Sequence, residues 1–263
     1  MLPSWEPLWP YRAVLAVDAR DFSALDSKGM QQVNADIPPL LAQALSASNV
    51  SAHWERRVFG QHTGDGYVAG MDPEVLPALV GCFPEALRHA LARRRAENSA
   101  MAPLQLRVSI HVGPLPPSGL GVPMVHTHRL LDDEALRAVL NRATPEITNT
   151  VLIISHRVYE DVFESGCLNG HFLPAQFVRH LVKVKKFRQP AWVHIPGFDW
   201  GLADPDIFEP ADAVDAVSKR PTASVPGTPA RLPAPAPRTV NFSQHGDDNV
   251  QAYTYHGAGW WRE

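Results

Sequence analysis

The stretch FGQHTGDGYVAGMD, residues 59–72, places one carboxylate between two glycines, with a strand-like run on either side. The segments HWERRVFG (53–60) and GYVAGM (66–71) predict two strands that pair as a hairpin around Thr63, Gly64 and Asp65. Asp-Gly is common in tight hairpin turns, and carboxylates are also preferred ligands of Mg²⁺. Asp65 is therefore either a turn residue or a metal ligand.

A second carboxylate ends the first strand-like run of the chain. The β-branched and apolar residues of RAVLAVDARDF (12–22) predict a buried strand that ends near Asp18. An open sheet can bring this strand end next to the loop that carries Asp65. Mg²⁺ binds through one or two carboxylates plus phosphate oxygens, so these two residues would suffice for a metal–nucleotide site.

The remaining segments alternate between helical and strand-like patterns. Apolar residues at helical spacing in 29–48 predict a helix that Pro38 and Pro39 split in two. LQLRVSIHVG (104–113) is an alternating strand. Helices are also predicted in 73–98, 128–142 and 156–163, and strands in 151–155, 177–187 and 190–195. This order predicts an α+β fold, in which helices pack on one face of a mostly antiparallel sheet.

Composition restricts the kinds of partner. Of the 263 residues 45% are hydrophobic, which is enough for a substantial core. A net charge of −3 provides no field that would attract nucleic acid. No apolar run approaches the length of a membrane span, and the widely separated Cys82 and Cys167 predict two free thiols. We therefore expect a cytoplasmic protein that binds neither nucleic acid nor membrane.

The composition changes near residue 197. Residues 1–197 form the predicted folded domain, and 198–238 predict a flexible linker with six prolines between Pro221 and Pro237. The last segment, 239–263, contains two short runs rich in aromatic, Asn and Gln residues, which could stack as a cross-β array of identical chains. The alternatives are a disordered tail and a tail that docks on the domain through Trp260 and Trp261.

The motifs, taken in order, resemble the class III nucleotide cyclases from about Arg12 to Gly197. The first strand ends in an Asp that is followed by a Phe, the hairpin carries Gly-Asp, and a later strand is followed by a helix with an Arg. A closing hairpin supplies a Lys. These motifs are VDARDFSAL (17–25), TGDGYVAG (63–70), IHVGPL (110–115), GVPMVHTHRLLD (121–132) and VKVKKFRQPAWVHI (182–195). The segments 129–140, 152–162 and 177–197 more closely resemble a bacterial subgroup that belongs to signalling or conflict systems, and the tail resembles bacterial amyloid signalling motifs.

This resemblance implies a ferredoxin-like sheet and a homodimer with its sites at the subunit interface. It implies that a nucleoside triphosphate is converted to a cyclic mononucleotide at two Mg²⁺ or Mn²⁺ ions held by Asp18 and Asp65. Arg129 falls on the catalytic Arg of the family, and Lys185 falls on its phosphate-binding Lys. The other nucleotide-binding positions are Phe22 and Gly64 in the motifs and Gln61 and Ser118 at the base-reading positions.

One departure from the family pattern bears on turnover. Val125 stands where the family has an Asn that stabilises the transition state, and a Val side chain can neither donate nor accept a hydrogen bond. His126 and His128 could replace the Asn, but only one of the two can point inward. Two hypotheses follow: a nucleotide cyclase, or a cyclase-like signalling adaptor that binds nucleotide without turnover and assembles through its tail.

Overall fold

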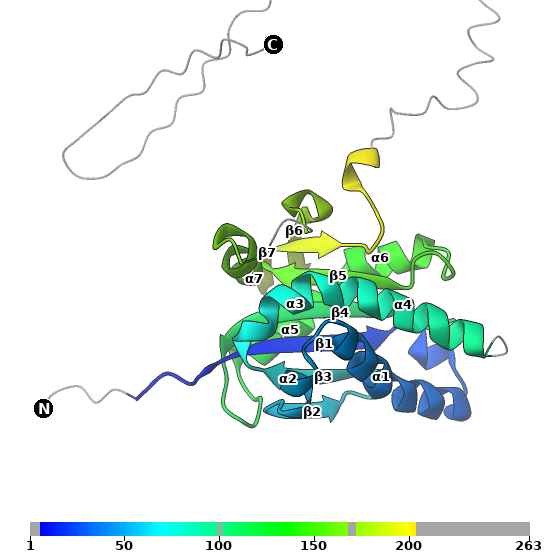
Figure 1. Ribbon diagram of the computed structural model, residues 1–263, viewed down its shortest axis with the longest axis horizontal. Helices are drawn as coiled ribbons and strands as arrows, with labels where there is room; N and C mark the ends of the chain where they lie inside the picture. The colour runs from blue at the N-terminus through cyan, green and yellow to red at the C-terminus, as the bar shows by residue number, and fades with distance from the viewer. Residues whose placement is uncertain (1–5, 99–100, 102, 168–171, 204–263) are drawn as a thin grey trace, which may run out of the picture. The chain divides into compact units, whose positions relative to one another are not determined.

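A computed structural model of the chain describes residues 6–98, 101, 103–167 and 172–203. Seven strands form one sheet in the order β2-β3-β1-β4-β5-β7-β6 (Figure 1). All neighbouring pairs are antiparallel except β4 and β5, which are parallel. The strands are β1 (Tyr11–Ala19), β2 (Phe59–His62), β3 (Gly66–Met71), β4 (Leu106–Pro114), β5 (Thr150–Ser155), β6 (Val178–Val184) and β7 (Phe187–His194). The predicted α+β class with a mostly antiparallel sheet is confirmed.

Helices cover the sheet on both faces. Because side chains alternate along a strand, Leu15 and Val17 of β1 join the main core beneath the long helices, whereas Val14 and Ala16 pack on the opposite face. The long helices α1 and α4 lie side by side over the main core, as expected for one helical layer (Figure 1). The helices are α1 (Ser27–Ala47), α2 (Ser51–Glu55), α3 (Leu76–Val80), α4 (Cys82–Glu97), α5 (Val122–Leu131), α6 (Glu134–Arg142) and α7 (His156–Tyr159). Both α5 and α6 pack on the opposite face, which the sequence did not indicate.

Short helical turns complete the described part. They are the 3₁₀ turns η1 (Phe22–Ala24), η2 (Pro73–Val75), η4 (Pro174–Gln176) and η5 (Trp200–Leu202), and the π-helical η3 (Glu160–Glu164). Trp200 packs against the cluster formed by α6 and strands β5, β6 and β7. Residues 204–238 of the predicted linker and the predicted tail, 239–263, lie outside the described residues.

Helix α1 is continuous through Pro38 and Pro39, so the predicted split at these residues is wrong. A proline inside a helix removes a backbone hydrogen bond and costs about 3 kcal/mol. Burial of Ile37, Leu41 and Leu45 stabilises the helix by about 1.5–3 kcal/mol per side chain, which offsets this cost. Packing of the apolar face therefore decides the structure of this segment.

Two further boundaries differ from the predictions. The segment predicted as a strand from His53 begins instead as α2, from which the buried Trp54 packs against the ring of Tyr67 with 5.7 Å between centroids. The single helix predicted over 128–142 is divided into α5 and α6. Helix α5 ends at Leu131 with Asp132 as its C-cap, and Asp133 caps α6 by accepting a hydrogen bond from the backbone N–H of Ala135.

Cys82 and Cys167 are both free, as predicted. Among the described residues, no helix is long and apolar enough to cross a membrane.

Candidate functional site

The hairpin loop is fixed against the end of β1 by its two glycines. Gly64 has φ +93°, which favours glycine, and a Cβ atom on Gly66 would lie 1.9 Å from the backbone oxygen of Val17. The backbone N–H of Ala19 donates to the backbone oxygen of Asp65 over 2.8 Å. These contacts hold Asp65 beside the end of β1, where Asp18 lies.

Asp18 is buried and paired with an arginine of the neighbouring strand. Asp18 and Arg107 are opposite each other in the β1–β4 register, and the guanidinium donates two hydrogen bonds of 2.7 Å to the two carboxylate oxygens. Burial raises the pKa of Asp18 to about 7, against the attraction of Arg107, and the nearby Asp65 carboxylate adds to the rise. Asp18 is therefore a carboxylate whose charge depends on Arg107.

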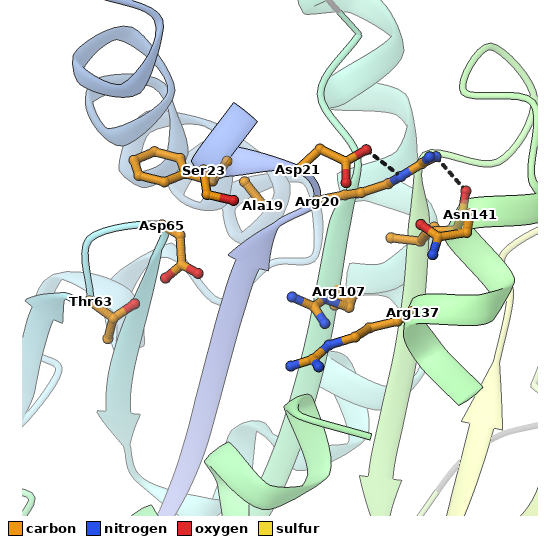
Figure 2. Close-up of a pocket in the computed structure, with 11 residues that line it drawn as sticks. Ala19, Arg20, Asp21, Ser23, Thr63, Asp65, Arg107, Arg137 and Asn141 are labelled. Carbon is orange, nitrogen blue, oxygen red and sulfur yellow. Dashed lines mark hydrogen bonds and ion pairs between the residues drawn. The ribbon is translucent and has the colours of Figure 1, made fainter. Parts of the chain in front are cut away.

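An open pocket of about 490 Å³ lies next to this pair; we call it the Asp65 pocket. In Figure 2 the side chains of Arg107 and Arg137 extend from β4 and α6 toward the hollow that Asp65 borders from the hairpin. Among the described residues, the Asp65 carboxylate has no hydrogen-bond or ion-pair partner and is free to take a ligand. The lining residues are Ala19, Arg20, Asp21, Phe22, Ser23, Thr63, Asp65, Arg107, Arg137, Leu140 and Asn141.

The two carboxylates differ in their fitness for a divalent cation. Asp65 fits, because its carboxylate is half-buried, unpaired within the described chain and open to a pocket. Asp18 fits only if Arg107 gives up its two hydrogen bonds. No group of three or more His, Cys, Asp or Glu residues that could hold a metal occurs in the described part. These ligands suit an ion that completes its coordination with phosphate oxygens and water.

A second pocket, of about 610 Å³, brings together Arg129 and Lys185; we call it the Arg129 pocket. Lys185 lies at the turn between β6 and β7, and Arg129 lies on α5, 3.6 Å from Asp132. Val125 borders the same pocket with 51% of its surface exposed, so an apolar side chain occupies the position of the expected Asn. The full lining is Val125, His126, Arg129, Lys185, Lys186, Phe187, Arg188 and Gln189, which makes the pocket strongly basic.

The two histidines of α5 differ in what surrounds them. The ring of His126 packs against Phe187, with 5.0 Å between centroids, and borders the Arg129 pocket. Burial lowers the pKa of His126, so its ring is neutral near pH 7 and can donate one hydrogen bond. Burial also lowers the pKa of His128, whereas Asp132 and Asp65 oppose this shift. The two histidines therefore have different electrostatic surroundings.

Of the remaining predicted residues, some lie at the Asp65 pocket and others lie outside both pockets. Phe22 lines the Asp65 pocket, and Gly64 shapes the adjoining loop. Gln61 and Ser118 are exposed and line neither of the two pockets. No residue is shared between the linings of these pockets, so Asp65 and Arg129 do not meet in one cavity of a single chain.

Sequence reasoning missed the three arginines of the Asp65 pocket, Arg20, Arg107 and Arg137. Arg107 stands at a polar position of the alternating strand β4, on the face opposite Leu106 and Val108, so the alternation alone does not distinguish it from a solvated arginine. Arg137 gives no signal either, because a single arginine on an amphipathic helix is ordinary. Arg137 reaches the pocket because α6 packs on the sheet.

No protein-family model matches the chain, and no curated protein matches it. Solved structures of nucleotide cyclases do resemble it at low identity. A bacterial light-regulated adenylyl cyclase is 15% identical with a TM-score of 0.48, and the match covers 74% of this chain and 56% of that one. An adenylate/guanylate cyclase/hydrolase from Silicibacter pomeroyi is 21% identical with a TM-score of 0.42, covering 72% and 98%. A structure from adenylate cyclases of Trypanosoma brucei is 11% identical with a TM-score of 0.45, and the match covers 72% of this chain and 91% of that one.

Proposed function

We propose that this chain binds a nucleoside triphosphate together with Mg²⁺ or Mn²⁺ and converts it to a cyclic mononucleotide, acting in bacterial signalling or defence. The observation that carries the proposal is the composition of the Asp65 pocket. It joins a free carboxylate for a cation with guanidinium groups for phosphate oxygens. The biological role rests on the sequence resemblance alone.

Different residues of the Asp65 pocket would bind the cation and the phosphates. A cation held by Asp65, and by Asp18 once Arg107 has turned away, would supply positive charge to the phosphates. Arg107 then has two N–H groups available for phosphate oxygens. Phe22 and Ser23 of η1 line the same pocket.

The Arg129 pocket supplies the complementary charges. Arg129 would stabilise the negative charge that develops at the α-phosphorus, and Lys185, with Lys186 and Arg188, would bind the terminal phosphates. Because the two pockets share no lining residue, we propose that they combine across a homodimer, each site taking one pocket from each subunit. The exposed apolar residues Leu120 and Val122, at the start of the helix α5 that carries Arg129, support such an interface.

The proposed reaction is an internal substitution at phosphorus. The ribose 3′-oxygen forms a bond to the α-phosphorus, and the bond from that phosphorus to the bridging oxygen of the β-phosphate breaks. Pyrophosphate leaves with the electron pair of that bond, and the hydroxyl proton passes to solvent. Val125 supplies no donor to the developing charge, so we expect turnover to be about a hundredfold to a thousandfold slower than with such a donor.

A second candidate function rests on Val125 in the Arg129 pocket. With an exposed valine in the Arg129 pocket, the protein could bind nucleotide without turnover and act as a signalling adaptor that assembles through residues 239–263. Both functions need the Asp65 pocket, and they differ in whether a cyclic product is formed.

The test is to incubate the full-length protein with ATP, GTP, CTP and UTP in turn, each with Mn²⁺, and to assay cyclic product by mass spectrometry. Asp65→Asn removes the free carboxylate at constant shape, and Asp161→Asn makes the same change at an exposed site outside both pockets. Product that is lost with Asp65→Asn and retained with Asp161→Asn supports the cyclase. Nucleotide binding without product supports the adaptor, and failure to bind any of the four nucleotides overturns both.

A further inference from the structure

Helix α6 forms one wall of the Asp65 pocket. Leu136 and Leu140 are fully buried against β5 and its neighbours, which anchors the helix on the sheet. Arg137, Leu140 and Asn141 are spaced three and four residues apart, so they share the helix face that lines the pocket. The backbone oxygen of Leu140 also accepts a 2.5 Å hydrogen bond from Arg20 at the end of β1. The wall is therefore held at the site from both sides.

The charges of the pocket leave Arg137 available. Arg107 pairs with Asp18, and Arg20 pairs with Asp21 at 2.9 Å, so these four charges balance each other. Asp65 and Arg137 remain. The contact of Arg137 with Asp132 is long, at 3.4 Å, and both side chains are substantially exposed, so this pair contributes little to stability. Asp132 also lies 3.6 Å from Arg129, so its single negative charge is shared between Arg129 and Arg137.

A second observation points to an anion. Arg107 is 9% exposed, lines the pocket, and has a buried Nη1 without a hydrogen-bond partner in the described chain. A buried guanidinium N–H without an acceptor is costly, so an acceptor from a ligand would stabilise it. In Figure 2 the guanidinium groups of Arg107 and Arg137 point in the same direction. An oxyanion with several acceptor oxygens suits both groups at once.

We propose that Arg137 of α6 is a phosphate-binding residue, which acts with Arg107 of the same chain on the triphosphate in the Asp65 pocket. The proposal rests on the proposed function and gives a role to a residue to which the sequence motifs assign none. In this arrangement Asp65 binds the cation, Arg107 and Arg137 bind phosphate oxygens, and α6 forms the wall of the site opposite the hairpin. The competing interpretation is that Arg137 is only the solvated partner of Asp132.

The test is calorimetric titration of the full-length protein with inorganic tripolyphosphate, with and without Mg²⁺. Arg137→Gln removes the charge, Arg137→Lys retains it without the planar fork, and Arg142→Gln removes the same charge at an exposed position of α6 outside the pocket. We expect Arg137→Gln to weaken tripolyphosphate binding about tenfold or more, the loss of one charge-assisted hydrogen bond. Arg137→Lys should lose less, and Arg142→Gln should stay within about twofold of the wild type.

Equal affinities for Arg137→Gln and Arg142→Gln, or no binding of tripolyphosphate by the wild type, would overturn the proposal. Arg137 is exposed, so its variants should fold, and thermal melting checks this. The cyclase assay separates the proposal for Arg137 from the proposed cyclase function. Tripolyphosphate binding that depends on Arg137 without any cyclic product supports this inference and refutes the cyclase. Cyclic product with an unchanged KM in Arg137→Gln supports the cyclase and refutes this inference.

Discussion

Replacing Arg107 by methionine tests whether Asp18 is as desolvated as its surroundings indicate. The two side chains are 10% and 11% exposed and share two hydrogen bonds of 2.7 Å. Well above pH 7, where Asp18 is charged in the wild type, removing its partner would leave that charge uncompensated, at a cost of up to about 3–5 kcal/mol. Arg95→Met provides the matched control, because Arg95 pairs with Glu146 where both side chains are exposed by 38% and 47%. That change should cost about 0–1 kcal/mol.

The pH dependence of the loss identifies its cause. With Arg107 in place the pKa of Asp18 is about 7, far above its ordinary value of 3.8, and removal of the guanidinium raises it further. At pH 6 Asp18 holds its proton in both folded proteins, so Arg107→Met leaves no unpaired charge there. Above pH 7 the wild type releases the proton, whereas the folded variant retains it and the unfolded variant does not. Each pH unit above 7 should therefore widen the gap in unfolding free energy by up to about 1.4 kcal/mol.

Urea denaturation at pH 6, 7, 8 and 9 measures this gap directly for wild type, Arg107→Met and Arg95→Met. A gap that grows by about 2–3 kcal/mol from pH 7 to pH 9 for Arg107→Met alone agrees with a buried carboxylate. A gap that is independent of pH, or as small as that of Arg95→Met, would refute the reasoning. Asp18 would then be well solvated, and its binding to a cation would not need Arg107 to move.

Other consequences of the structure can be measured by the same denaturation assay. Gly66→Ala should cost about 3 kcal/mol or more, because its Cβ would meet a backbone oxygen of β1 at 1.9 Å, whereas Gly64→Ala should cost about 1 kcal/mol for its positive φ alone; equal losses would contradict this. Pro39→Ala should raise the free energy of unfolding by about 1–3 kcal/mol, since Pro39 is an exposed residue inside α1, and no gain would mean that the helix is broken there. Burial lowers the pKa of His111 to about 4, so between pH 6.5 and pH 4 this histidine should contribute a loss of up to about 3 kcal/mol of unfolding free energy as pH falls. His111→Gln should remove that loss, and the exposed His89→Gln should not.

The parts of the fold that were predicted correctly follow from local patterns. The alternation of β4 puts Leu106, Val108 and Ile110 in the main core, as expected. The hairpin of β2 and β3 follows from Gly64 and Gly66, which the loop geometry requires. Such signals depend on residues close in sequence, so they can be interpreted without the tertiary structure.

The parts that were missed depend on distant contacts. The continuity of α1 through Pro38 is decided by packing against α4, which lies about 50 residues later. The partner of Asp18 is 89 residues away on β4, and Arg137 reaches the pocket only because Leu136 and Leu140 fix α6 on the opposite face of the sheet. The motifs identified two carboxylates of the candidate site but could not show that one is already paired with an arginine.

That pairing links the two ligands of the proposed site. A cation that binds Asp18 must displace Arg107, and a phosphate that binds Arg107 must draw it away from Asp18. Either ligand alone breaks a buried ion pair and leaves one of its charges uncompensated, which costs binding free energy. When both bind, Asp18 gains the cation and Arg107 gains the phosphate, so neither charge is left unpaired. Because such coupling is reciprocal, the cation should strengthen polyphosphate binding by the same factor by which polyphosphate strengthens cation binding.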